Sequence, residues 1–335
     1  MNTAGSRPTL QVSHLQTSFM TKAGEVKAVN DVSFSVHPGQ VLGLVGEAGS
    51  GKTVTGFSIM GLLDHPGRII GGEIQFQGEN LVGATKKRWQ QLRGSQIAMV
   101  FQDPMMTLNP VLRIDTQMIE AIRAHESVSR KEARQRARDA LGQVGIPSPD
   151  ERLKAYPHQF SGGMRQRVMI AIALSCDPKV LIADEPTTAL DVTIQAQILD
   201  LVKRLRKELG MAIVWVTHDL GVVASLADRV MVMYSGFIVE RANVEQLYGE
   251  PKHPYTMALL ATLPEVEGER ATRLESIEGQ PPDQLRAPTS CPFAPRCSYA
   301  FDRCSQENPL LQSVSSQHEV ACWWDVQENR PRDYN

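Results

Sequence analysis

The spacing of apolar residues divides most of the chain into short strands and helices. Between residues 10 and 45, apolar and polar residues alternate, as in LQVSHL, VKAVNDVSFSV and QVLGLVG. This period of two predicts β-strands, joined by turns at KAGE and HPGQ. The apolar residues of TVTGFSIMGLL, at 53–63, recur at helical spacing instead. The predicted fold therefore opens with strands, a glycine-rich turn and a helix.

The second half of the chain alternates between continuous apolar runs and amphipathic segments. KVLIADEP at 179–186 and MAIVWVTH at 211–218 are apolar almost to their last residues, which is typical of strands buried on both faces of a sheet. Between them, TIQAQILDLVKRLRKELG has the helical period, and VMVMYSGFIVER at 230–241 predicts a pair of strands. The alternation predicts an α/β fold with a mostly parallel sheet.

A helical insertion is expected within this α/β core. Residues 115–143 are polar with helical periodicity, and GMRQRVMIAIALSCDP predicts a mostly buried helix that stops at Pro178. After about Pro251 the sequence becomes proline-rich and irregular. The predicted domain limits are a flexible N-terminus at 1–9, an α/β domain at 10–250 with a helical subdomain at about 103–175, and a small C-terminal extension at 251–335.

Charge and hydrophobicity narrow the classes of function. The 335 residues include 35 Lys and Arg against 37 Asp and Glu, a formal net charge of −2. This balance gives no electrostatic argument for nucleic-acid binding, and none is expected. Apolar runs such as VMIAIAL are far shorter than the roughly 20 residues that cross a bilayer. Any membrane-spanning part of the functional assembly is therefore expected in other subunits.

The glycine-rich turn carries the first candidate chemistry. VGEAGSGKTVTG at 45–56 fits G-x-x-x-x-G-K-[ST] at every fixed position. Glycines let backbone N–H groups curl around phosphate oxygens, Lys52 would reach the β- and γ-phosphates, and Thr53 would ligate Mg²⁺. A chance glycine-rich turn is the alternative, which the strand–loop–helix context disfavours. The predicted ATP-binding residues here are Gly46, Glu47, Ala48, Gly49, Ser50, Gly51, Lys52 and Thr53.

The strand at 179–186 ends in two carboxylates, where uncompensated charge is costly. Asp184 fits the Mg²⁺-side carboxylate of a nucleotide site, and Glu185 fits the base that polarises the attacking water. His218 ends the next buried strand, from which a histidine can contact a γ-phosphate. A lone histidine at a strand end is more often structural, so His218 becomes a functional prediction only in combination with the other motifs.

A second glycine-containing helix start lies in FSGGMRQR at 160–167. Ser161, Gly162 and Gly163 open a helix, which makes another N-terminus suited to phosphate. One chain does not need two such sites for one nucleotide. We therefore predict that this segment serves a nucleotide held by a second copy or a homologue, in a head-to-tail pair.

Taken in order, the glycine-rich loop, VFQDP, FSGGMRQR, LIADEP, TALD and VTHD resemble the motifs of ATP-binding cassette (ABC) ATPases, over residues 10–240. The resemblance implies a P-loop cassette with a RecA-like core, an antiparallel β-subdomain and a helical subdomain. It implies that Gln102 senses Mg²⁺ and the membrane subunit. It also implies that Asp191 belongs to the D-loop and that His218 is the switch histidine.

Two further residues are judged against this family pattern. Phe19 is the candidate for the aromatic ring that stacks on adenine, and an ordinary strand phenylalanine is the alternative. Met164 stands where many signature motifs have glutamine. This departure leaves the serine and glycine contacts to phosphate unaffected, so an active site is still expected.

The C-terminal sequence narrows the resemblance. EPKHPYTMALL, GQPP and CPFAPRC resemble the extension of D-type oligopeptide and dipeptide permease ATPases. This implies an ATP- and Mg²⁺-dependent importer subunit, peripheral on the cytoplasmic face of the inner membrane. The implied partners are an F-type ATPase, two transmembrane permease subunits and an extracytoplasmic solute-binding protein. Nickel, glutathione and other permeases share the extension, so another solute is the alternative. A non-transport ABC ATPase is disfavoured, because such proteins typically contain two cassettes or a long coiled coil.

Four of the five cysteines lie close to the C-terminus: Cys291, Cys297, Cys304 and Cys322. Their spacing lacks the short C-x2-4-C knuckles common in zinc sites, whereas the spacing of iron–sulfur ligands is set by the fold. Similar extensions in the family can carry a [4Fe-4S] cluster. We predict such a cluster, with Zn²⁺ or unligated thiols as alternatives. Cys176 is predicted to be a small core residue.

Overall fold

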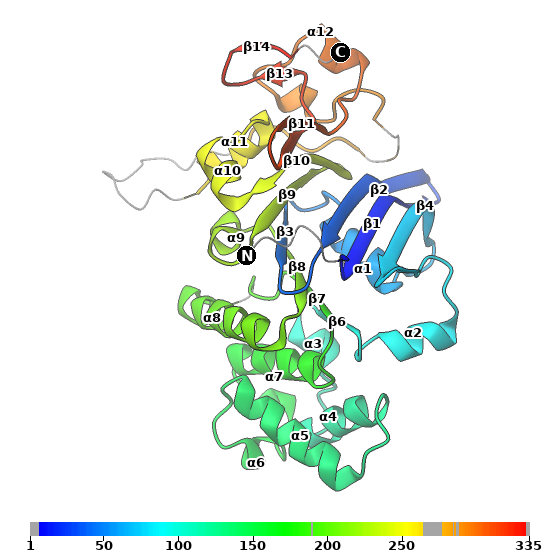
Figure 1. Ribbon diagram of the computed structural model, residues 1–335, viewed down its shortest axis with the longest axis vertical. Coiled ribbons are helices and arrows are strands. Elements are labelled where there is room, and N and C mark those ends of the chain that lie inside the picture. Colours follow the sequence, from blue (N-terminus) through cyan, green and yellow to red (C-terminus); the bar gives the residue numbers. More distant parts are fainter. Residues whose placement is uncertain (1–6, 189, 264–276, 284, 286–287, 333–335) are drawn as a thin grey trace. The chain divides into compact units, whose positions relative to one another are not determined.

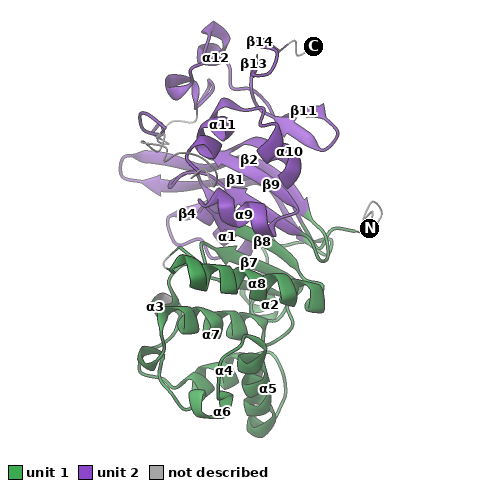
Figure 2. Cartoon of the chain, turned by 90° about the vertical axis from the view of Figure 1, so that its left-hand side faces the viewer, with its two compact units in different colours: residues 1–10, 36–40, 76–215 green, residues 11–35, 41–75, 216–335 purple. Residues whose placement is uncertain are grey.

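The computed structural model describes residues 7–188, 190–263, 277–283, 285 and 288–332 (Figure 1). Residues 1–6 of the predicted flexible N-terminus lie outside this described part. The chain divides into two compact units (Figure 2). Unit 1 contains residues 1–10, 36–40 and 76–215, and unit 2 contains residues 11–35, 41–75 and 216–335. Residue 250 is not a boundary between the units, because the predicted C-terminal extension belongs to the same unit as the glycine-rich loop.

Three neighbouring strands, β6, β7 and β8, lie wholly or mostly in unit 1. β6 (Ile97–Val100) and β7 (Val180–Asp184) pair in parallel, and every residue of both strands is buried. β8 (Ala212–Thr217), most of which lies in this unit, is also buried throughout. Parallel strands covered on both faces need continuous apolar runs, which is why the sequence pattern predicts β7 and β8 correctly.

The helical part of unit 1 contains a break that the sequence analysis did not locate. The polar stretch at 115–143 forms two helices, α4 (Ile114–Arg123) and α5 (Arg130–Gln143). Ser129 begins the second helix, because its side chain accepts a hydrogen bond from the backbone N–H of Glu132. The remaining elements of the unit are β5 (Glu79–Asn80), α2 (Lys86–Leu92), α3 (Pro104–Thr107), α6 (Pro149–Arg152), η1 (Pro157–Gln159), α7 (Gly162–Leu174) and α8 (Val192–Leu209).

Among the described residues, unit 2 contains strands of three sheets, the third being a two-stranded pair within residues 324–331. In the first, β1 (Leu10–Thr21) lies between β2 (Gly24–Val36) and β4 (Gly67–Phe76). The short turn between β1 and β2 makes this pair antiparallel. In the second sheet, β3 (Val41–Val45) pairs in parallel with β9 (Arg229–Tyr234), which forms an antiparallel hairpin with β10 (Phe237–Asn243). The helices that accompany these strands are α1 (Lys52–Met60) and α9 (Leu220–Leu226).

The C-terminal region is more regular than its proline-rich sequence predicts. β12 pairs antiparallel with β10, so this region extends the second sheet of unit 2. The prediction of an irregular extension is therefore wrong at this edge. The elements of the region are α10 (Val244–Gly249), α11 (Pro254–Ala261), η2 (Ala294–Arg296), α12 (Asp302–Gln306), β11 (Gln312–Ser315), β12 (His318–Val320), β13 (Trp324–Asp325) and β14 (Arg330–Pro331).

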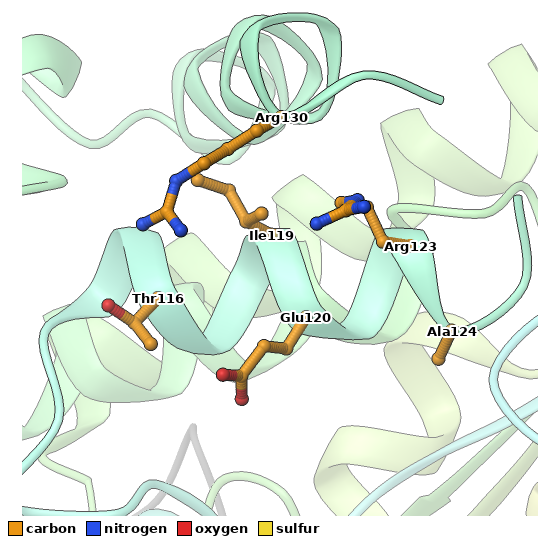
Figure 3. Close-up of a pocket in the computed structure, with 6 residues that line it drawn as sticks. All are labelled: Thr116, Ile119, Glu120, Arg123, Ala124 and Arg130. Atoms are coloured by element: carbon orange, nitrogen blue, oxygen red, sulfur yellow. The ribbon is translucent and has the colours of Figure 1, made fainter. Parts of the chain in front are cut away.

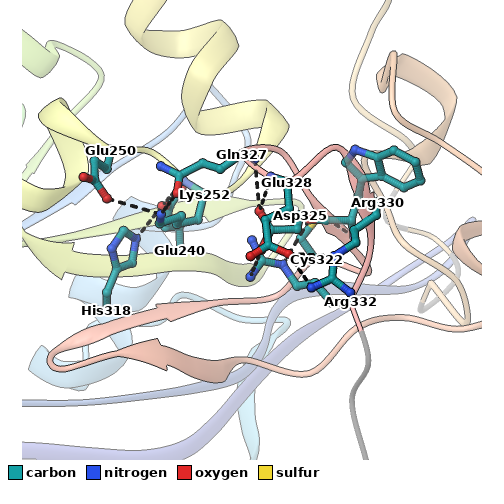
Figure 4. Close-up of polar contacts among 11 residues, drawn as sticks. Glu240, Glu250, Lys252, His318, Cys322, Asp325, Gln327, Glu328, Arg330 and Arg332 are labelled. Carbon is teal, nitrogen blue, oxygen red and sulfur yellow. Dashed lines mark hydrogen bonds and ion pairs between the residues drawn. The ribbon is translucent and has the colours of Figure 1, made fainter.

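A buried carboxylate on β10 ties the C-terminal region to the sheet. Glu240 has no exposed surface, and its oxygens accept hydrogen bonds from the backbone N–H groups of Lys252 (2.6 Å) and His253 (3.0 Å). The ring of His318 lies 2.7 Å from the same carboxylate (Figure 4). A buried charge needs such partners, so Glu240 fixes both segments that approach it. Within the described residues, no helix has the length and apolar character that a membrane crossing requires.

Candidate functional site

The glycine-rich loop of unit 2 joins the end of β3 to the start of α1. Gly46 and Gly51 have φ angles of 155° and 106°. A Cβ on Gly46 would lie 2.1 Å from the carbonyl oxygen of Met233, and a Cβ on Gly51 would lie 2.4 Å from that of Ala28. Neighbouring backbone therefore leaves room for glycine alone at both positions.

Lys52 is the first residue of α1 and is only 5% exposed. Its Nζ donates to the carbonyl oxygens of Gly46 (2.7 Å) and Glu47 (2.9 Å), and it lies 3.4 Å from Ser50 Oγ. Thr53 follows with an exposed side chain. The loop thus combines a buried ammonium group, a helix N-terminus and an accessible hydroxyl, which is an arrangement suited to a phosphate with its metal ion.

In unit 1, the two predicted carboxylates lie at the end of β7. Asp184 is 5% exposed, and Glu185 follows with a φ of 45°. Such a conformation is strained for a glutamate, and strain of this kind is concentrated at functional sites. Glu185 Oε2 accepts hydrogen bonds from Gln102 Nε2 (3.3 Å) and Thr188 Oγ1 (3.1 Å). Thr188 lies in the TALD segment, but the sequence analysis did not single it out.

The signature segment opens α7. Ser161 caps the helix, because its Oγ accepts a hydrogen bond from the backbone N–H of Met164. A Cβ on Gly163 would lie 2.5 Å from Cγ2 of Ile194 in α8. Close packing against α8 is therefore sufficient to explain a glycine at this position. Asp191 caps α8 by accepting a hydrogen bond from the Ile194 backbone N–H at 3.0 Å.

A pocket of about 220 Å³ in unit 1 is lined by residues from two of the predicted motifs. Gln102 and Gly162 both line it, together with the chain around Asp103 and Pro186. Another pocket, of about 360 Å³, lies between α4 and the start of α5, where Arg123 and Arg130 approach it (Figure 3). It contains none of the predicted site residues.

His218 and Phe19 belong to unit 2 with the glycine-rich loop. His218 is exposed after the end of β8. Phe19 is half-buried in β1, and its ring is so close to Gly67 that a Cβ there would lie 2.6 Å from Cε1. The predicted site residues are thus divided between the units. Their roles in catalysis and binding stay predictions.

Two residues that contact the loop were missed by the sequence analysis. Tyr255, in α11, is fully buried and its hydroxyl oxygen accepts a hydrogen bond from the Glu47 backbone N–H at 2.9 Å. Arg296 forms two hydrogen bonds with the Glu47 carboxylate, at 2.7 and 3.0 Å. These bonds raise the pKa of Arg296, and burial raises the pKa of the Tyr255 phenol. Tyr255 lies in HPYT and Arg296 lies in CPFAPRC, two segments that resemble the permease family but carry no local sign of contact with the loop.

The four C-terminal cysteines lie in the same unit as the loop. All five cysteines are among the described residues, and none forms a disulfide. The backbone N–H of Cys291 donates to the Cys304 carbonyl oxygen at 3.0 Å. Burial and the neighbouring thiols raise the pKa of Cys291 to about 11, and burial raises that of Cys322 to about 12. Within the described residues, no group of three or more His, Cys, Asp or Glu side chains is placed to hold a metal ion. The predicted cluster is therefore not confirmed.

The fold and these motifs define a class of protein. The family described as "ABC transporter" matches residues 29–188, and the family described as "Oligopeptide/dipeptide transporter, C-terminal region" matches residues 239–304. The chain belongs to the ABC transporter ATP-binding subunits, and it is an ATPase of that class. The predicted family and fold class are thereby confirmed.

Individual relatives sharpen this assignment. The chain is similar to the dipeptide transport ATP-binding protein DppD of Haemophilus influenzae, with 48% identity over 97% of this chain and 98% of the relative. It is similar to the oligopeptide transport ATP-binding protein OppD of Bacillus subtilis, with 49% identity over 94% of this chain and 88% of the relative.

Solved structures support the same fold. The dimeric structure of MJ0796, a bacterial ABC transporter cassette, has a TM-score of 0.63 and 25% identity, covering 70% of this chain and 98% of that one. The structure of cbiO1 from Clostridium perfringens has a TM-score of 0.63 and 29% identity, covering 73% and 92%.

Proposed function

We propose that this protein is the ATP-hydrolysing subunit of an importer that moves di- or oligopeptides across the cytoplasmic membrane. One observation carries the proposal: the similarity to dipeptide and oligopeptide transport ATP-binding proteins extends over nearly the whole chain. The match to the oligopeptide/dipeptide transporter C-terminal region supports it independently of the cassette. The protein then works at the cytoplasmic face of the inner membrane, on two permease subunits that receive peptide from an extracytoplasmic binding protein.

The loop of unit 2 is proposed to bind ATP. Its backbone N–H groups and the Lys52 ammonium group hold the phosphates, and Phe19 stacks on the adenine. Thr53, Gln102 and Asp184 would hold Mg²⁺, because hydroxyl, amide and carboxylate oxygens are the donors that this ion prefers. When bound, Mg²⁺ neutralises charge on the phosphate oxygens.

Glu185 is proposed to act as the general base. It accepts a proton from the attacking water, and Gln102 and Thr188 orient its carboxylate through the hydrogen bonds to Oε2. His218 contacts the γ-phosphate. These assignments are supported by the buried strand that leads to Glu185 and by its constrained backbone.

The signature segment is proposed to serve the nucleotide of a partner cassette. Ser161, Gly162, Gly163 and Asp191 would contact an F-type ATPase subunit, in a head-to-tail pair. The similar cassette MJ0796 is described as dimeric, which supports the association of two cassettes. A helix N-terminus with a serine cap is also suited to contact with a γ-phosphate.

Transport assays test the proposal. The complete transporter, reconstituted in vesicles with its binding protein, should take up a labelled dipeptide or tetrapeptide when ATP is supplied to the side that carries this subunit. Glu185→Gln should abolish uptake, and unlabelled peptide should compete. Uptake of nickel or glutathione in place of peptide would overturn the substrate assignment. ATP hydrolysis without any solute movement would overturn the transport function.

The four C-terminal thiols are proposed to bind a metal group, with [4Fe-4S] as the first candidate and Zn²⁺ as the second. Cysteine sulfur is the donor that both groups use. The hydrogen bond from the Cys291 backbone N–H to the Cys304 carbonyl oxygen supports the proposal for two of the four positions. Protein purified without oxygen should be brown, and the colour should bleach on reduction. Serine at any one of the four positions should remove it, whereas Cys176→Ser should not. Colourless protein with one zinc would leave only the second candidate, and metal-free protein would overturn both.

A further inference from the structure

A negative charge occupies the loop proposed to bind phosphate. Glu47 is the second residue of the loop, and its carbonyl oxygen accepts a hydrogen bond from the Lys52 ammonium group. An uncompensated carboxylate on a residue of this loop would oppose the binding of an anionic nucleotide. The fold therefore needs a device that neutralises Glu47 or directs its side chain away.

Arg296 provides that device. Besides its two bonds to the Glu47 carboxylate, its guanidinium donates to Tyr234 Oη (3.2 Å) and to the carbonyl oxygens of Ile277 (3.1 Å) and Glu278 (2.9 Å). These five bonds use the five N–H donors of an arginine. The side chain is 4% exposed, against 28% for Glu47. Arg296 is thus held by its surroundings, and it holds Glu47 in turn.

A cluster of aromatic rings packs beside the contact between Arg296 and Glu47. The ring of Tyr234 lies 4.6 Å from that of Tyr255 and 5.3 Å from that of Phe293, measured between centroids. All three residues are buried in one apolar cluster of unit 2. This packing fixes the Tyr255 hydroxyl that accepts the Glu47 backbone N–H. Both the side chain and the backbone of Glu47 are consequently held by the C-terminal region.

We propose that Arg296 and Tyr255 are positioning residues for ATP binding. Arg296 neutralises Glu47 and directs its carboxylate away from the phosphates, while Tyr255 fixes the backbone at the start of the loop. The C-terminal region thereby sets the affinity of the cassette for ATP. The inference rests on the proposed nucleotide site at residues 46–53.

The two halves of the ion pair should have opposite effects on ATP binding. For the purified full-length subunit, titration calorimetry with ATP should show about tenfold weaker binding after Arg296→Ala, because one unneutralised charge near a surface contributes roughly this much. Glu47→Gln should bind ATP about threefold more tightly, because the Arg296 guanidinium then keeps a positive charge that no carboxylate offsets. The double variant should return near the wild-type affinity. A purely structural ion pair would instead weaken binding in both single variants.

Further variants separate charge from packing. Arg296→Lys should keep most of the affinity, whereas Tyr255→Phe should weaken it about threefold through the lost hydrogen bond. Arg330→Ala is the matched control, since Arg330 pairs with Glu328 on the exposed surface and should bind ATP normally. Unchanged affinity in Arg296→Ala, or weaker binding in Glu47→Gln, would overturn the inference. The second result remains available if Arg296→Ala does not fold.

Lys52→Ala distinguishes this inference from the proposed site itself. It should lose ATP binding in the calorimeter. Normal binding in Lys52→Ala would mean that the loop is not the nucleotide site, and would remove the basis of both proposals. Lost binding in Lys52→Ala together with wild-type affinity in Arg296→Ala would overturn the positioning role alone.

Discussion

The two helix starts that are proposed to meet phosphate, at α1 and α7, are built in different ways. In unit 2, glycines with positive φ bend the loop so that it encloses the Lys52 ammonium group, and no side chain caps α1. In unit 1, the Ser161 side chain caps α7, and Gly162 and Gly163 are already helical. The first segment is shaped to surround a ligand. The second presents a helix end, and its glycine pair also serves close packing.

The residues that hold each segment in place also differ in their distance along the chain. The loop of unit 2 is held by Tyr255 and Arg296, which follow it by more than 200 residues, whereas α7 packs on α8, which follows it closely along the chain. Nucleotide affinity in unit 2 should therefore respond to the C-terminal region. The signature segment in unit 1 should respond to its own helices.

The largest effect is expected from Glu185→Gln. Removing the general base should lower the ATPase rate of the assembled complex by roughly 10²- to 10⁴-fold. ATP binding by the loop of unit 2 should be retained, because Lys52 and its hydrogen bonds are unchanged. Steady-state hydrolysis and ATP titration measure the two quantities. Near wild-type turnover would show that Glu185 is not the base.

The stability of the C-terminal region that holds the loop of unit 2 should also depend on pH. Burial lowers the pKa of His253 to about 4, despite the nearby Glu240 carboxylate. The unfolded chain, with a histidine pKa near 6.5, binds this proton first as the pH falls, so stability is full at pH 7 and is lost between about 6.5 and 4. The loss should reach about 3 kcal/mol from this residue.

Denaturant unfolding at pH 7 and pH 4 measures this loss. In the wild type, His253 Nδ1 accepts a hydrogen bond from the Tyr255 backbone N–H at 3.0 Å. The amide oxygen of His253→Asn can accept the same hydrogen bond. The variant should therefore fold with a weaker pH dependence than the wild type. Identical pH profiles for the two proteins would show that another group titrates in this range.

Ser161→Arg tests the signature segment of unit 1. The isolated subunit should bind ATP with unchanged affinity, because the loop of unit 2 is intact. The ATPase rate of the complex should fall at least about tenfold, since the arginine occupies the helix end proposed to meet the partner's nucleotide. Weaker ATP binding by the isolated subunit would place Ser161 at its own nucleotide and reject the pairing.

Local patterns predicted the loop, Asp184 and Glu185, because each is marked by its own strand and neighbouring residues. They could not predict that Arg296 contacts Glu47, 249 residues away, or that His318 contacts Glu240, 78 residues away. Those contacts depend on how β12 and the C-terminal loops pack, which no local period records. The break before α5 was different. Ser129 and Glu132 form a recognisable start signal, which the overall polarity of the stretch concealed.

The smallest effect is expected at Gly163, where a substitution tests whether packing or ligand contact is the reason for the glycine. Gly163→Ala adds a Cβ 2.5 Å from Ile194 Cγ2, and should lower the free energy of unfolding by about 1–3 kcal/mol. Gly142→Ala is the control: it also lies in a helix, but its added Cβ has no atom within 4 Å, so it should stabilise the protein by roughly 0.5–1 kcal/mol. Urea unfolding measures both. Equal stability of Gly163→Ala and wild type would mean that Ile194 yields, leaving ligand contact as the reason for glycine.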